Sequence, residues 1–158
     1  MEGKAGQSRS VVIAMDTSPS AKKAFQWYID NIHRPGDHVV LVTVVHVRDA
    51  FTSAEWCSLM KSLDSDLMTG NIAKQRHELE LQLDELTAMI NEAKVSGTVQ
   101  FVHASNARKG ILGVAEDCKA SCIVVGSRGL GNFQSGILGS TSEQILNNSD
   151  VTIILCPN

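Results

Sequence analysis

The stretch CIVVGSRGLGNFQSGILGSTSEQILN, from Cys122 to Asn147, decides the fold. Its first residues, Cys122–Val125, are apolar and predict a strand, and five glycines follow within the next fourteen residues. A helix is expected from Ser140, where Ser140 and Glu143 have the spacing of a capping box. A glycine-rich loop between a strand and a helix can turn backbone N–H groups toward an anion. The sequence therefore predicts a phosphate-bearing ligand, most simply a nucleotide.

Four other segments are also apolar and strand-like. Most are nearly continuous β-branched runs, which predict strands buried on both faces of a parallel sheet. The segment Val99–Ala104 is more mixed and is expected at an edge of the sheet. The five expected strands are Val11–Met15, Val39–Val47, Val99–Ala104, Cys122–Val125 and Val151–Cys156.

Segments with helical periodicity lie between these strands. Ser18 and Pro19 predict the start of the first helix, and the turn residues 34–37 end it. A long helix follows, with Ile72, Leu79, Leu83, Leu86 and Ile90 on one face, and a third covers residues 111–118. The alternation of strands and helices predicts an α/β domain with a doubly wound, five-stranded parallel sheet and helices on both faces. Ligands of such domains bind at the carboxyl ends of the strands.

Composition narrows the class of protein. The chain has 158 residues, is 43% hydrophobic and carries a formal net charge of -3. We expect a single domain over residues 10–158 after a short flexible lead-in, residues 1–9. No basic block or long apolar run is present, so neither nucleic acid nor a membrane is an expected partner. Four cysteines without a Cys-x-x-Cys pair, and no apolar leader, favour a cytoplasmic location.

Three common motifs are excluded. A Walker P-loop needs Gly-Lys before Ser or Thr, but no lysine lies between Gly126 and Thr141. The dinucleotide fingerprint fails because Gln134 stands where its last glycine belongs. His77 and Glu78 begin a metalloprotease motif that Leu81 breaks, and the cysteines lack zinc-site spacing, so no metal ligand is predicted.

The spacing that is present is Gly126, two residues, Gly129, nine residues, Gly139 and then Ser140. In this motif, and in Asp16 at the end of the first strand, the chain resembles the ATP-binding branch of the universal stress protein family. The resemblance covers about Ser10 to Pro157. It implies a Rossmann-like, adenine nucleotide alpha hydrolase-like fold with strand order 3-2-1-4-5.

The resemblance also implies roles for individual residues. Asp16 would bind the ribose hydroxyls, Val47 would pack on adenine, and Ala14 and Val125 would face the base. Asp16 could instead be a turn residue that accepts hydrogen bonds from nearby N–H groups. The phosphates would be held by backbone N–H and hydroxyl groups of Gly126, Gly129, Gly139, Ser140 and Thr141. Arg128, in the same loop, would either reach the phosphates or remain solvated.

The expected function is that of a nucleotide-dependent regulator of the stress response. We expect ATP, or AMP or ADP, with Mg²⁺ held through the phosphates. Hydrolysis should be slow or absent, because no general base for water attack is evident. A weak ATPase or nucleotide hydrolase and a ligand-free dimeric interaction module remain alternatives. The apolar strand Val151–Leu155 is expected at an edge, where the resemblance implies a homodimer. The loop from Gly129 to Gly139 and the segment Arg48–Gly70 are the expected moving parts.

Overall fold

The computed structural model of the chain describes residues 8–16, 18–46, 70–126 and 140–156. Strands and helices alternate through this part, as the sequence predicts. The elements, in chain order, are β1 (Arg9–Ala14), α1 (Pro19–Asn31), β2 (Asp37–His46), α3 (Gly70–Ala93), β3 (Ser96–Ala104), α4 (Ala107–Asp117), β4 (Cys122–Gly126), α5 (Ser140–Asn148) and β5 (Thr152–Cys156). Of the two expected moving parts, the loop Gly129–Gly139 lies outside the described residues, and so does the segment Arg48–Gly70 except for Gly70, the first residue of α3.

The five strands form one parallel sheet in the order β3-β2-β1-β4-β5. The predicted fold class and strand order are therefore confirmed. The mixed strand β3 lies at one edge, as expected, and β5 lies at the other. The apolar strands β2, β1 and β4 lie inside the sheet, where both faces are covered by helices, whereas the apolar strand β5 lies at an edge.

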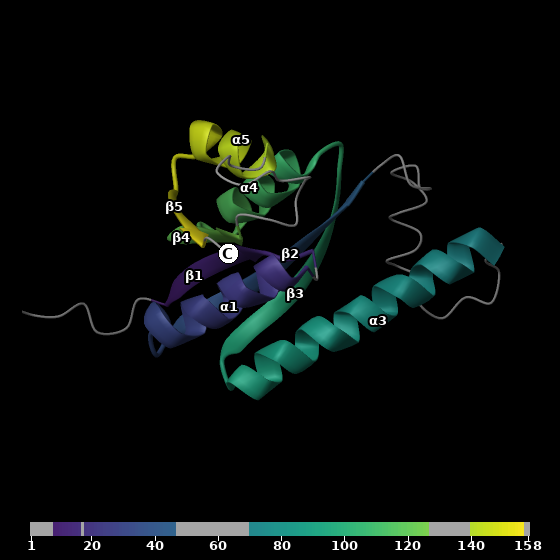
Figure 1. Cartoon of the computed structure of the whole chain (residues 1–158), viewed down its shortest axis with the longest axis horizontal. Coiled ribbons are helices and arrows are strands. Elements are labelled where there is room, and N and C mark those ends of the chain that lie inside the picture. Colours follow the sequence, from purple (N-terminus) through teal and green to yellow (C-terminus); the bar gives the residue numbers. More distant parts are fainter. Residues whose placement is uncertain (1–7, 17, 47–69, 127–139, 157–158) are drawn as a thin grey trace, which may run out of the picture.

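In the described part of the chain, α1 and α3 cover one face of the sheet and α4 and α5 cover the other (Figure 1). One layer of the core joins residues of α1 and α3, such as Phe25 and Leu86, to alternate residues of the strands. The second layer joins α4 and α5, through residues such as Ile111 and Ile145, to the opposite set of strand residues. This division follows from the pleat, because successive strand side chains point to opposite faces.

The start of α1 matches its prediction. Ser18 is the N-cap, its hydroxyl accepts a hydrogen bond of 3.2 Å from the N–H of Ala21, and Pro19 begins the helix. A similar cap, not predicted, begins α4, where the Asn106 side chain accepts a hydrogen bond of 2.9 Å from the N–H of Lys109. Both caps lie after the carboxyl end of a strand, so these two helices point their N-termini toward the same edge of the sheet.

Asp37 anchors the opposite, amino edge of the sheet. Its side chain is only 3% exposed and accepts two hydrogen bonds from Arg9, at 2.9 and 2.6 Å. The Tyr28 hydroxyl and the N–H of Arg34 donate to the same carboxylate at 2.7 and 3.0 Å. Burial alone would raise the pKa of Asp37, but the hydrogen bonds from Arg9, Tyr28 and Arg34 lower it to about 2. This one carboxylate thus ties together β1, α1 and β2.

The long helix α3 is only partly packed against the sheet. Leu86 and Ile90 are 0% and 5% exposed, whereas Leu83, expected on the same face, is 40% exposed. Leu79, one turn nearer the N-terminus of α3, is half-buried, so Leu83 lies at the border of the buried stripe of the helix. The N-terminal half of α3 extends past the sheet (Figure 1). Within the described residues, no helix has the combined length and apolar character that crossing a bilayer requires.

Candidate functional site

The carboxyl ends of β1 and β4 lie side by side at the centre of the sheet. The register pairs Ile13 with Val124, so the residues that follow each strand reach the same edge. The end of β1 is fixed to β2, because the N–H of Met15 donates to the carbonyl of Val42 and the hydroxyl of Thr43 donates to the carbonyl of Met15, both at 2.8 Å. Sequence reasoning missed Thr43, although a hydroxyl inside an otherwise apolar strand was a visible signal.

Asp16 lies two residues after the end of β1 and is half-buried at this edge. Its carboxylate accepts a hydrogen bond of 2.9 Å from the N–H of Ser18, and Ser18 in turn caps α1. The turn role expected as an alternative is therefore confirmed. The same turn holds the carboxylate between the end of β1 and the N-terminus of α1, where a ligand at the edge could meet it.

Gly126, the last residue of β4, is held in a very close contact. A Cβ atom at this position would lie 2.6 Å from the Ser20 hydroxyl oxygen and 2.9 Å from the Ser20 carbonyl oxygen. No side chain larger than hydrogen fits there without moving α1. On its other side, the hydroxyl of Ser142 in α5 donates to the Gly126 carbonyl at 3.4 Å. The first glycine of the motif therefore has a packing role that the sequence did not reveal.

These contacts bring two helix N-termini to the end of one strand. Ser20 and Ser142 each lie in the first turn of their helix, α1 and α5, and both contact Gly126. Helix N-termini carry unsatisfied N–H groups and a partial positive charge. The first turn of α1 contains no acidic residue, whereas that of α5 contains Glu143. The arrangement suits an anionic group placed between α1 and α5.

The apolar residues expected to face the base lie deeper than anticipated. Ala14 and Val125 are 3% and 0% exposed, and both belong to the core layer under α4 and α5. Their side chains support the strand ends from within the core and present almost no surface at the edge.

The other predicted site residues are only partly covered by the structure. Ser140 and Thr141 form the first turn of α5, in the predicted place after the glycine-rich loop. Four predicted residues lie outside the described part of the chain, namely Val47, Arg128, Gly129 and Gly139. The structure thus places Asp16, Gly126 and the start of α5 at one edge of the sheet, as the sequence predicted.

The chain belongs to the universal stress protein family, whose family model matches residues 7–157. One relative, Universal stress protein PHOS32 of Arabidopsis thaliana, is 27% identical over 149 residues, which cover 88% of this chain and 60% of the relative. Another, the uncharacterized protein C167.05 of Schizosaccharomyces pombe, is 23% identical over 90% of this chain and 22% of the relative. The chain therefore spans less than two thirds of the length of these curated relatives.

Solved structures share the fold. The hypothetical protein MJ0577 superposes with a TM-score of 0.71 at 17% identity, covering 96% of both chains. A universal stress protein family protein from Arabidopsis thaliana, solved with AMP bound, has a TM-score of 0.62 at 20% identity and covers 95% of this chain and 92% of its own. A universal stress protein in complex with cAMP has a TM-score of 0.57 at 16% identity and covers 96% and 98%.

Proposed function

We propose that this chain binds an adenine nucleotide, with ATP as the expected ligand, at the carboxyl edge of its sheet. The observation that carries the proposal is the meeting of the N-termini of α1 and α5 at Gly126, beside the carboxylate of Asp16. A phosphate is suited to the helix N-termini, and a carboxylate is suited to a ribose diol. The relatives solved with AMP and with cAMP support an adenine nucleotide as the class of ligand.

In this proposal each part of the ligand has its own partners. Asp16 accepts hydrogen bonds from the ribose hydroxyls, using carboxylate lone pairs beyond the one that receives the Ser18 N–H. Gly129, Gly139 and the start of α5 hold the phosphates, with Arg128 as a further cation, and Val47 packs on the base. Because Gly126 already contacts Ser20 and Ser142, its part is to hold the two helix N-termini in place rather than to bind the phosphate itself.

The proposed role is binding and regulation, with slow or no hydrolysis. Phosphoryl transfer requires a positioned nucleophile and base in addition to charge stabilisation, and only the last of these has candidates here. Among the residues that the structure describes, no group of three or more His, Cys, Asp or Glu side chains could hold a metal ion. Mg²⁺ would therefore enter with the nucleotide, held through its phosphates. The bound nucleotide would then act by changing the shape or partners of the protein in the stress response.

Calorimetry with ATP and AMP tests the proposal, together with analysis of nucleotide released from the denatured purified protein. We expect Asp16→Ala and Gly139→Val each to abolish the binding heat. Asp30→Asn, which removes an exposed carboxylate of α1, should bind like the parent chain. Gly126→Val is a poor test, because its side chain would collide with Ser20 and could unfold the protein. Absence of heat with either nucleotide at millimolar concentration, in folded protein, would contradict the proposal.

A further inference from the structure

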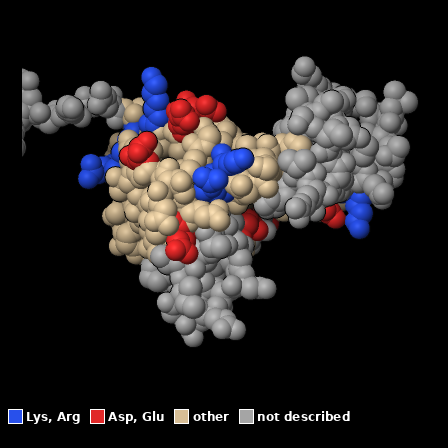
Figure 2. Space-filling view, turned by 90° about the horizontal axis from the view of Figure 1, so that it is seen from above, with Lys and Arg blue, Asp and Glu red and all other residues tan. Residues whose placement is uncertain are grey.

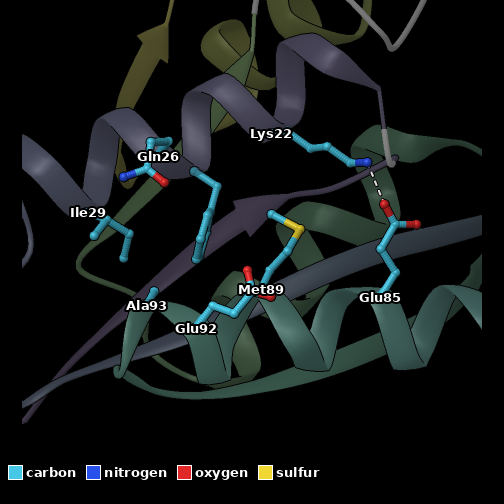
Figure 3. A pocket seen from close by; sticks show the side chains of 8 residues that line it. Lys22, Gln26, Ile29, Glu85, Met89, Glu92 and Ala93 are labelled. Atoms are coloured by element: carbon cyan, nitrogen blue, oxygen red, sulfur yellow. Dashed lines mark hydrogen bonds and ion pairs between the residues drawn. The ribbon is translucent and has the colours of Figure 1, made fainter.

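A groove of about 350 Å³ lies between α1 and α3, on the opposite face of the sheet from α4 and α5 (Figure 3). Its floor is apolar, and its rim carries charged and amide groups. The floor residues are Phe25, Ile29, Met89 and Ala93, and the rim residues are Lys22, Gln26, Glu85 and Glu92. The groove is separate from the carboxyl edge of the sheet, so a ligand can occupy it independently of the proposed nucleotide site.

The helix that forms one wall of the groove is acidic. Between residues 77 and 93, α3 contains five Asp or Glu residues and no Lys or Arg. Three of them, Glu78, Glu85 and Glu92, are seven residues apart and therefore lie along one stripe of the helix, and all three are exposed. The face formed by α4 and α5 is different, because acidic and basic side chains are interspersed there (Figure 2).

Among the described residues at the rim, Lys22 is the only cation, and it does not cancel this charge. Lys22 forms an ion pair with Glu85, in which the two side chains are 42% and 44% exposed. A pair so open to solvent contributes little to stability and can exchange partners. Glu92, also on the rim, is exposed and lies beyond this ion pair (Figure 3). An incoming cation would therefore find two carboxylates, Glu85 and Glu92, along the α3 wall of the groove.

We propose that this groove is a docking site for a basic amphipathic helix of a partner protein. Apolar side chains spaced three and four residues apart along such a helix would enter the floor beside Phe25 and Met89. Its Lys or Arg side chains would meet Glu85 and Glu92, with Glu78 extending the contact along α3. The exposed Leu81, at 55% exposure, adds further apolar surface on the same helix.

The acidic charge of the groove disfavours two other possible occupants, a second copy of the chain and the chain's own segments. A second copy of the chain would bring one acidic α3 against another, and like charges juxtaposed in an interface are unfavourable. Two of the chain's own segments outside the described residues are not basic either. Residues 47–69 contain two basic and four acidic residues, and residues 1–8 contain one of each. A separate, basic partner is therefore the occupant that this groove fits.

The test uses the full chain and a fluorescein-labelled amphipathic peptide of leucine and lysine, about 15 residues long so that it can form a helix. We expect this peptide to bind in fluorescence anisotropy and a matched leucine–glutamate peptide to fail. The double variant Glu85→Gln, Glu92→Gln should weaken binding about tenfold, since it removes two opposite-charge contacts and leaves Lys22 without its ion-pair partner. Binding should also weaken with added salt.

A matched control removes the same charge elsewhere. Glu116 and Asp117 are exposed on α4, so Glu116→Gln, Asp117→Asn should bind the peptide like the parent chain. In ¹⁵N-labelled protein, the peptide should shift amide signals of α1 and α3. Equal binding by both double variants, or shifts centred on α4 and α5, would overturn the proposal.

Two further results would assign the groove to another occupant and would therefore overturn the proposal. Self-association that is lost in the Glu85, Glu92 double variant, measured by sedimentation, would assign the groove to a second copy. Amide shifts of residues 48–68 in that variant without peptide would assign it to the chain's own segment.

Discussion

At the scale of single residues, Asp37 has the largest expected effect on stability. Its carboxylate is buried and receives four hydrogen bonds, two of them from Arg9. Asp37→Asn removes the charge that Arg9 faces and replaces one acceptor oxygen with a donor. We expect it to lower the free energy of unfolding by roughly 3 kcal/mol, measured by urea denaturation. Asp30→Asn, at an exposed site of α1, should change it by less than about 0.5 kcal/mol.

The lowered pKa of Asp37 predicts that the stability of the protein depends on pH. The folded-state pKa of Asp37 is lowered from 3.8 to about 2. Between these values the unfolded chain binds more protons, so this contribution to stability is present above about pH 4 and is lost as the pH falls toward 2. The loss should amount to about 2 kcal/mol. Asp37→Asn should lack this component, and parallel stability curves for the two proteins over that range would contradict the assignment.

Part of the candidate site was also visible at the residue scale. Asp16 could be placed at the edge because an acid that directly follows an apolar strand must lie near the strand's carboxyl end. The close contact between Gly126 and Ser20 could not be predicted, since it joins residues more than a hundred positions apart through the docking of α1 on β4. The sequence predicted only a turn at Asp37. Its burial could not be predicted, because it depends on contacts with Arg9 and Tyr28.

At the scale of elements, two glycines of α4 make a matched pair. A Cβ atom on Gly110 would lie 2.7 Å from a methyl carbon of Val44, whereas one on Gly113 would have no neighbour within 4 Å. Gly113→Ala should therefore raise the free energy of unfolding by about 0.5–1 kcal/mol, because alanine favours helix. Gly110→Ala gains the same propensity but forces α4 away from β2, with an overpacking cost of typically 1–3 kcal/mol.

Urea denaturation of both glycine variants checks this prediction. We expect Gly110→Ala to be less stable than the parent chain by about 1 kcal/mol after the gain in helix propensity is subtracted. Equal stability of the two variants would show that α4 can shift on the sheet without cost.

The elements themselves were largely predictable, because their signals are local. Continuous apolar runs marked the central strands, and Ser18 with Pro19 marked the start of α1. The exposure of Leu83 was missed, since helical periodicity shows which residues share a broad face but not which of them lie at its border. The cap at Asn106 was missed too, although Asn is a favoured N-cap residue.

At the scale of the whole molecule, the edge strand β5 supports the predicted homodimer. One side of β5 pairs with β4, and Ile153, Ile154 and Leu155 are only half-buried. We expect two copies to associate along β5, because an apolar edge strand is otherwise an aggregation hazard. Sedimentation equilibrium should show a dimer at micromolar concentration, and Ile154→Lys should dissociate it. Thr152→Lys, at an exposed position of the same strand, is the control for added charge. A parent chain that is monomeric at these concentrations would contradict the expectation.

The carboxylate of Asp37 has a mechanical consequence for the molecule. It fastens the C-terminal end of α1 to the two neighbouring strands, while the other end of the same helix rests against Gly126 at the ligand edge. A rigid helix that is anchored at its C-terminal end tilts about that anchor when its N-terminal end is displaced. A ligand that displaced the first turn of α1 from Gly126 would therefore tilt this helix, with the greatest displacement near Pro19.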